Sequence, residues 1–333
     1  MRKKNTRFFK KKFDIKLTLN IVLNLILIPI YLFLFIFCLL LCFIPIFPTK
    51  IALENLTEHL DKDKMSARFF ISVLYLNYVF YFFEMFIFLP LHLAVSINKN
   101  EFKNFIESLI KKYNFSPDSQ NRIVYLSGHL GNLEANALPV SFLLSSQQKN
   151  KFIVSLAKPT KYRWLNVFIK RLRETNHLKI LWTEGNFILE MVKNLKSGNS
   201  LGIFIDQKPP KGGIFIKFFK SYSAFPSAGL RLCLNQEALI VYILSRRIVP
   251  GLFFHYYEEG LNEHLVSVYE SKTALKSQTN LYENKIYDYQ QIVEKEKRPA
   301  LEIASFTDWL EKIILKCPTQ WCWDYKKWSR KIK

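Results

Sequence analysis

His129 and Glu134 are the two side chains whose types and spacing best suit proton transfer, with four residues between them. An imidazole takes a proton from a hydroxyl most readily when a carboxylate holds one ring nitrogen and leaves the other free. On a single helix the pair would lie about 140° apart. We therefore expect His129 to precede a helix and Glu134 to lie in its first turn, where a carboxylate is favoured. Gly128 and Gly131 permit the turn that this arrangement needs. A structural histidine beside a helix-capping glutamate would show the same spacing, so both interpretations stay open at this point.

Short β-rich runs alternate with helical segments from residue 121 onward, and this alternation predicts an α/β fold. We expect a mixed central sheet with flanking helices, in which the apolar run before His129 is a strand. A second apolar run ends just before Asp206, which is a favourable position for a site residue. The expected strands are 123–126, 152–156, 201–205, 214–219, 239–244 and 265–269, and the expected helices are 133–144, 162–173, 187–195, 226–235 and 306–315. Residues 271–300 are polar and are expected to form a surface excursion.

The N-terminal part of the chain is expected to be a membrane anchor. Residues 1–16 are rich in lysine and arginine, and residues 17–48 carry no charge, a run longer than the roughly 20 residues that a spanning helix needs. The cationic flank favours a cytoplasmic N-terminus. A single span would place the remainder outside the cytoplasm, whereas Pro29, Pro45 and Pro48 permit a kinked, re-entrant or interfacial helix. The sequence leaves both arrangements open.

A second apolar segment, 69–97, contains Asn77, Glu84 and His92. Because polar groups are unfavourable against lipid, we favour a helix that lies against the membrane and the catalytic body over a second span. The expected division is a basic cytoplasmic tail over 1–16, an anchor helix over 17–48, a helical and partly membrane-associated region over 49–118, and an α/β catalytic domain over 119–333.

Composition favours a folded, basic protein with anionic partners. Half of the 333 residues are hydrophobic and the formal net charge is +21, which suits lipid headgroups, nucleic acid or an acidic carrier protein. A lysine-rich proteome would give the same balance. Lysine is spread along the whole chain and no nucleic-acid-binding motif occurs, so we expect no nucleic-acid partner. The five cysteines form no CxxC pair or zinc pattern, and GxSxG, HExxH, Walker A and GxGxxG motifs do not occur. We therefore expect neither a metal nor a cofactor.

Four ordered segments resemble the lipid A biosynthesis acyltransferases, which belong to the HxxxxD/E superfamily of glycerolipid-type acyltransferases. They are SGHLGNLE at 127–134, KPTKYRWLNVFIKRLR at 158–173, LGIFIDQKPPKGG at 201–213 and PTQWCWDYKKW at 318–328. The similarity extends from about residue 20 to the end of the chain. Thr319 stands where many relatives carry Glu, and Asp324-Tyr325 replaces a commoner His-Arg pair.

The resemblance implies direct transfer of an acyl chain from an acyl carrier protein thioester to a hydroxyl of an anionic Kdo-lipid A precursor. His129 would be the base and Glu134 would hold it. Arg171 or Arg173 would stabilise the oxyanion, and Asp206 would shape the site by pairing with that arginine. The expected substrate-binding residues are Ser127, Gly128, Asn132, Lys208, Lys211 and Arg246.

The expected location is the bacterial inner membrane, with the catalytic domain on the cytoplasmic face. Two alternatives stay open: the same chemistry on another phospholipid or glycolipid, and a non-enzymatic basic membrane protein that binds lipid. The aromatic and basic segment 321–328 fits either an interfacial patch or core packing with a basic rim.

Overall fold

The computed structural model describes residues 14–41, 43–44, 47–113, 122–147, 151–210, 212–261 and 294–328. Most of the predicted basic tail, Lys211, the expected strand 265–269 and most of the segment 271–300 lie outside the described residues.

A seven-stranded mixed sheet forms the centre of the molecule, in the order β1-β9-β8-β2-β5-β3-β4. Five neighbouring strands run parallel, whereas β9 is antiparallel to β8. A separate antiparallel hairpin is made by β6 and β7. The bounds are β1 Val95–Ser96, β2 Ile123–Ser127, β3 Ile153–Ala157, β4 Leu178–Trp182, β5 Ser200–Phe204, β6 Ile214–Phe218, β7 Ser221–Phe225, β8 Leu239–Val249 and β9 Leu252–Glu259. The predicted mixed α/β fold is therefore confirmed.

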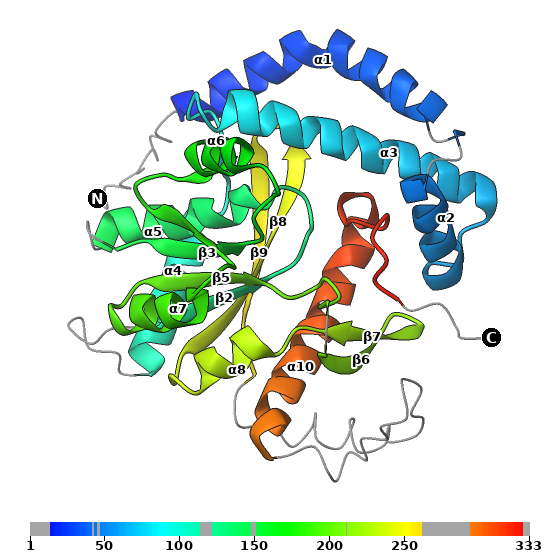
Figure 1. The fold of residues 1–333 in the computed structure, drawn as a ribbon. Helices are drawn as coiled ribbons and strands as arrows, with labels where there is room; N and C mark the ends of the chain where they lie inside the picture. Colours follow the sequence, from blue (N-terminus) through cyan, green and yellow to red (C-terminus); the bar gives the residue numbers. More distant parts are fainter. Residues whose placement is uncertain are drawn as a thin grey trace, which may run out of the picture.

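Helices cover both faces of the sheet, and alternate residues of β2 pack against each layer (Figure 1). Ile123 and Tyr125 point toward α4 (Lys99–Lys112) and α5 (Ala137–Gln147). Val124 and Leu126 point toward the opposite layer, which contains α7 (Phe187–Lys196), α8 (Ala228–Leu234) and α10 (Glu294–Lys316). Because β2 is buried on both sides, its C-terminal end is held rigidly at the centre of the sheet.

The N-terminal part contributes three helices; the two long ones lie across one end of the sheet, and the short one lies to the side, next to the C-terminal segment (Figure 1). They are α1 (Ile15–Leu41), α2 (Phe47–His59) and α3 (Lys64–Phe83), and α3 continues as a π-helical turn, η1 (Glu84–Phe88). Within the described residues, α1 and the α3–η1 segment are long and apolar enough to cross a membrane. The predicted N-terminal anchor is therefore present as a candidate, and most of its apolar side chains are exposed.

Polar side chains tie both apolar helices to the α/β body. Asn20 and Asn24 of α1 each donate to the Pro250 carbonyl oxygen, at 3.3 and 2.9 Å. On α3, the Asn77 amide donates to the Thr319 carbonyl at 3.2 Å, and Glu84 of η1, which continues α3, is fully buried. Of the polar residues that counted against a lipid-facing span at 69–97, Asn77 and Glu84 therefore face the protein, whereas His92 is exposed. The segment 49–118 also contributes β1 and α4 to the α/β body.

Candidate active site

His129 lies just beyond the C-terminal end of β2, and Asp206 lies just beyond the end of the neighbouring parallel strand β5. Carboxyl ends of adjacent parallel strands meet at one edge of a sheet, so these two residues come together there. The Nδ1 atom of His129 lies 2.6 Å from Asp206 Oδ1, and the His129 backbone N–H donates to Asp206 Oδ2 at 2.7 Å. The imidazole is thus held at two points by a single carboxylate.

Asp206 is buried and ionised. Burial alone would raise the pKa of Asp206, but the electrostatic interaction with His129 and three hydrogen bonds outweigh burial and hold that pKa below its usual value. The third hydrogen bond comes from the indole Nε1 of Trp321, at 2.9 Å. Among the described residues none bonds to Nε2 of His129, and about a quarter of the side chain is exposed (24%). That nitrogen is free to take a proton.

The expected contact between Glu134 and His129 is wrong. The Glu134 carboxylate instead accepts from Arg173 Nε at 2.6 Å and from the Tyr81 hydroxyl at 2.7 Å. The side chain of Asn132 caps the backbone N–H groups of Glu134 and Ala135, at 2.9 and 3.1 Å, and starts the 3₁₀ turn η2 (Glu134–Asn136). This turn directs the carboxylate toward α6 (Arg163–Arg173) and α3.

The expected pairing of Asp206 with an arginine is wrong for the same reason: the two carboxylates exchange partners. Asp206 holds the histidine and Glu134 holds the arginine. The sequence places His129 near Glu134, but it does not reveal that β2 and β5 are neighbours, with the β3–β4 segment between them in the chain. The position of Asp206 after an apolar run was the signal for its importance.

The structure shows which of the two candidate arginines, Arg171 or Arg173, faces the site. Two positions on a helix differ by about 200°, so the side chains lie on opposite sides of α6. Arg173 points inward to Glu134, and its Nη2 also donates to the Tyr81 hydroxyl at 3.3 Å. Arg171 is exposed. Only Arg173 belongs to the group of residues around His129 and Glu134.

The predicted substrate-binding residues divide into supports and accessible groups. The Ser127 hydroxyl is buried and donates to the Ile243 carbonyl at 2.8 Å, and Asn132 is buried at the cap of η2. At Gly128 a Cβ atom would lie 3.1 Å from Asp206 Oδ2, so glycine allows the close approach of the carboxylate. Lys208 is half-buried in the loop after Asp206. Arg246 is exposed on β8.

A buried ion pair that sequence reasoning missed supports the loop after His129. Arg247 Nε and Nη2 bond to the two oxygens of Glu84, at 2.5 and 2.7 Å, and both side chains are buried. The Asn132 amide donates to the same carboxylate at 2.8 Å. Glu84 therefore links η1, β8 and the cap of the 3₁₀ turn. In the sequence, the position of Glu84 within the apolar segment 69–97 was the feature that could have indicated a buried ion pair.

The C-terminal segment closes the site from another side. Gln320 accepts from the Gly131 N–H through its backbone carbonyl at 2.8 Å, and its side chain bonds to both backbone groups of Arg247, each at 2.8 Å. Gly131 has φ +64°, and a Cβ there would lie 2.3 Å from the Ser245 carbonyl oxygen. Trp321 and Trp323 are buried, so core packing, not an interfacial patch, explains this aromatic segment.

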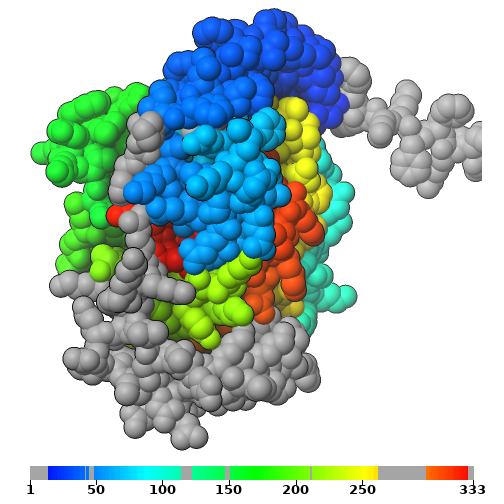
Figure 2. Space-filling view, turned by 90° about the vertical axis from the view of Figure 1, so that its right-hand side faces the viewer, coloured from blue at the N-terminus to red at the C-terminus, as the bar shows by residue number. Residues whose placement is uncertain are grey.

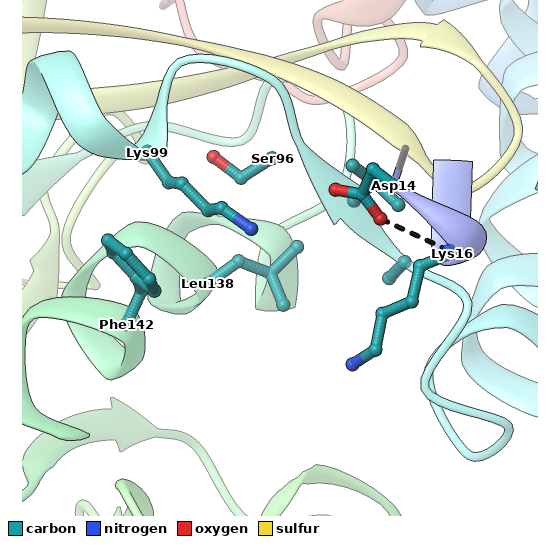
Figure 3. Close-up of a pocket in the computed structure, with 8 residues that line it drawn as sticks. Asp14, Lys16, Ser96, Lys99, Leu138 and Phe142 are labelled. Atoms are coloured by element: carbon teal, nitrogen blue, oxygen red, sulfur yellow. Dashed lines mark hydrogen bonds between the residues drawn. The ribbon is translucent and has the colours of Figure 1, made fainter. Parts of the chain in front are cut away.

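A small cavity of about 180 Å³ lies elsewhere, at the start of α1. Figure 3 shows the Lys99 side chain extending between Ser96 and Leu138, with Asp14 and Lys16 on the other side. None of the residues around His129 lines it. The candidate active site is accordingly the edge of the sheet at His129 and Asp206.

The C-terminal edge of the mixed sheet thus holds a histidine bonded to a buried carboxylate, together with an arginine–glutamate pair, and this arrangement could support proton transfer. The family model described as bacterial lipid A biosynthesis acyltransferase matches residues 3–258. The chain belongs to this family and is therefore an acyltransferase of lipid A biosynthesis. A comparison with curated proteins found no match.

Proposed function

We propose that the protein transfers a fatty acyl chain from an acyl carrier protein thioester to a hydroxyl of a Kdo-lipid A precursor, with His129 as the general base. The observation that carries this proposal is the His129–Asp206 pair at the edge of the sheet, which occupies Nδ1 and leaves Nε2 of a partly exposed side chain without a partner among the described residues. Family membership supports acyl transfer in lipid A biosynthesis. Donor and acceptor are assigned here by the family and by the basic charge of the chain, +21.

In the proposed reaction, Nε2 of His129 takes the proton of the acceptor hydroxyl as the oxygen attacks the thioester carbonyl. A tetrahedral oxyanion forms, the carbon–sulfur bond breaks, and the imidazolium returns its proton to the departing thiolate. The products are an ester and a free thiol, with no covalent enzyme intermediate. Positioned base catalysis contributes roughly 10²–10⁴-fold in rate.

Asp206 keeps the imidazole oriented during this cycle. Its negative charge stabilises the imidazolium, and the hydrogen bond to Nδ1 selects the tautomer that leaves Nε2 unprotonated. The buried position of Asp206 strengthens this interaction because water does not screen it.

Arg173 is the proposed partner of the oxyanion. Glu134 and Tyr81 hold the guanidinium from two sides, at 2.6 and 3.3 Å. An arginine held in place by its neighbours stabilises developing charge without reorganising during the reaction. The remaining N–H groups of Arg173 are the donors assigned to this task. Arg171 is not assigned a role in catalysis.

The proposed setting is the bacterial inner membrane, with the α/β body on the cytoplasmic face, where acyl carrier protein thioesters are available. The exposed apolar helix α1 supports membrane attachment. The phosphates of the acceptor and the acidic carrier protein are both suited to a basic protein. We assign Lys208 and Arg246 to these contacts because both are accessible.

The test is an assay of purified protein with a tetra-acylated Kdo-lipid A acceptor and a panel of acyl carrier protein thioesters, read by mass spectrometry. We expect His129→Ala to lose at least about 100-fold in rate while its thermal denaturation stays unchanged. His177→Ala, a histidine in the turn before β4, is the matched control and should remain active. Full activity of His129→Ala would overturn the base assignment, and transfer only to another lipid would overturn the acceptor.

A further inference from the structure

The helix α6 exposes large apolar side chains on its outward side. Leu165, Ile169 and Leu172 are half-buried toward the body, and no residue of α6 is fully buried. On the outward side, Trp164 is 69% exposed and Phe168 is 44% exposed. Neighbouring exposed aromatic side chains of this size mark a surface that interacts with a partner or a membrane.

These side chains continue an aromatic strip, which we define as Phe82, Phe86, Phe168 and Trp164. The ring centroids of Phe82 and Phe86 lie 6.4 Å apart, and those of Phe86 and Phe168 also lie 6.4 Å apart. Phe82 is 59% exposed and Phe86 is 51% exposed. The strip therefore crosses from α3 and η1 onto α6 without leaving the surface.

The aromatic strip lies at the same end of the molecule as the exposed apolar helix α1. In Figure 1, α6 lies just below α1 and α3, and in Figure 2 the green surface of α6 borders the blue surface of α1. A bilayer that receives α1 thus meets α6 as well. This continuity favours a lipid surface over a soluble protein partner.

Positive charge flanks the part of the aromatic strip that lies on α6. Arg163, Lys170 and Arg171 are exposed on the outward side of α6. Lys170 has only a loose contact with Glu174, at 3.9 Å, on the helix surface. Long basic side chains beside aromatic ones extend toward lipid headgroups while the rings enter the acyl boundary. Such a surface matches an anionic bilayer.

We propose that α6 is a second membrane-docking element: its aromatic strip enters the interface of an anionic bilayer, and Arg163, Lys170 and Arg171 contact the headgroups. The inward side of the same helix carries Arg173, which is bonded to Glu134. Docking of α6 therefore brings the site to the surface from which a lipid acceptor arrives. This last link rests on the proposed function, whereas docking itself does not.

Trp164 provides a direct probe of docking. The other five tryptophans are buried or half-buried, and α1 contains none. Full-length protein is reconstituted into phosphatidylethanolamine–phosphatidylglycerol vesicles whose acyl chains are brominated, and tryptophan quenching is compared with that of Trp164→Phe. We expect clearly greater quenching in the wild type. Equal quenching in the two proteins would overturn the proposal.

The charges are tested with the same probe. In anionic vesicles, Arg163→Gln/Lys170→Gln/Arg171→Gln should reduce the part of the quenching that depends on Trp164. High salt should reduce it in the wild type, because salt screens exposed charges. If neither the triple variant nor high salt changes the quenching, contact between these basic side chains and the headgroups is overturned.

Activity provides a second readout. Trp164→Ser/Phe168→Ser should lower transfer to an acceptor presented in vesicles by about tenfold, the loss expected for two partly buried aromatic rings, and leave transfer to a detergent-dispersed acceptor unchanged. Ile188→Ser/Leu189→Ser removes two exposed apolar side chains from α7, far from α1, and is the matched control.

The outcomes separate the hypotheses. If Trp164→Ser/Phe168→Ser loses the same amount of transfer activity in vesicles and in detergent, the two side chains support the fold of the enzyme, and docking is overturned. If the same variant shows a raised KM for the acyl carrier protein in detergent, the aromatic strip contacts that protein. This result also overturns docking. If His129→Ala proves active while Trp164 is quenched by brominated lipid, the proposed function fails and docking stands.

Discussion

At the scale of single residues, the site depends on an exchange between two acids. Asp206 takes the position on the imidazole that the spacing of the HxxxxE motif had assigned to Glu134. Both acids remain near the site, but Asp206 orients the imidazole and Glu134 positions an arginine. A short motif predicts which residues gather, whereas the pairing among them depends on strand order.

Replacing Asp206 by Asn tests the orienting role, because the amide keeps the shape and loses the charge. We expect kcat to fall by roughly 10³–10⁴-fold, as when a buried acid that selects a histidine tautomer is neutralised. The double variant His129→Ala/Asp206→Asn should be no slower than His129→Ala alone, since the two act as a unit. Steady-state kinetics of the three variants decide; additive losses would contradict the pairing.

At the scale of elements, the most apolar runs were predictable, whereas several short or polar-interrupted strands were not. The strands around β2, β3, β5, β6 and β8 and the helices α5 to α8 fall where hydrophobic patterning put them. The strands β1, β4, β7 and β9 were missed. In β9, for example, polar and aromatic residues replace a continuous apolar run, and the strand forms because it pairs with β8 across a tight turn at Gly251, where φ is +75°.

The Glu84–Arg247 pair joins η1 to β8 and, through Asn132, to the 3₁₀ turn η2. We expect this pair to contribute strongly to the stability of the fold. Glu84→Gln leaves a buried guanidinium without its counter-charge, which costs about 3–5 kcal/mol. Thermal denaturation in detergent is the measurement. The double variant Glu84→Met/Arg247→Met should recover much of the loss, since replacing both partners removes the uncompensated charge.

An exposed pair on α7, Glu190 with Lys193 at 2.7 Å, offers the matched control. Glu190→Gln should change the free energy of unfolding by less than about 1 kcal/mol, because water screens both groups. If Glu84→Gln and Glu190→Gln lower the free energy of unfolding by similar amounts, burial does not explain the effect of the Glu84–Arg247 pair.

At the scale of the whole molecule, the C-terminal segment is a structural part of the site. Trp321 bonds to Asp206, and Lys327 is fully buried against Phe225, with its Nζ 3.4 Å from the ring centroid. This segment lies beyond residue 258, where the family match ends. Its role could not be derived from composition, which fitted interfacial and buried tryptophans equally well.

Burial lowers the pKa of Lys327 to about 7, so this lysine makes the stability of the protein depend on pH. The unfolded chain, with its lysine pKa near 10.4, binds more protons than the folded chain between about pH 7 and 10. Lys327 therefore opposes folding most at and below pH 7, and this penalty is relieved as the pH rises.

We accordingly expect Lys327→Met to be more stable than the wild type at pH 7, with an advantage that shrinks toward pH 10. Melting temperatures of both proteins across this range provide the measurement. The difference between them isolates Lys327 from the other lysines of the chain. An advantage that stays constant with pH would contradict charge burial as the cause.

The bonds from Gln320 to Gly131 and from Trp321 to Asp206 join the end of the chain to its middle. Loss of the segment 318–328 would therefore remove both the indole that bonds to Asp206 and the carbonyl that accepts from Gly131. Local unfolding at this C-terminal segment would thus disturb the surroundings of His129, although the two lie far apart in the sequence.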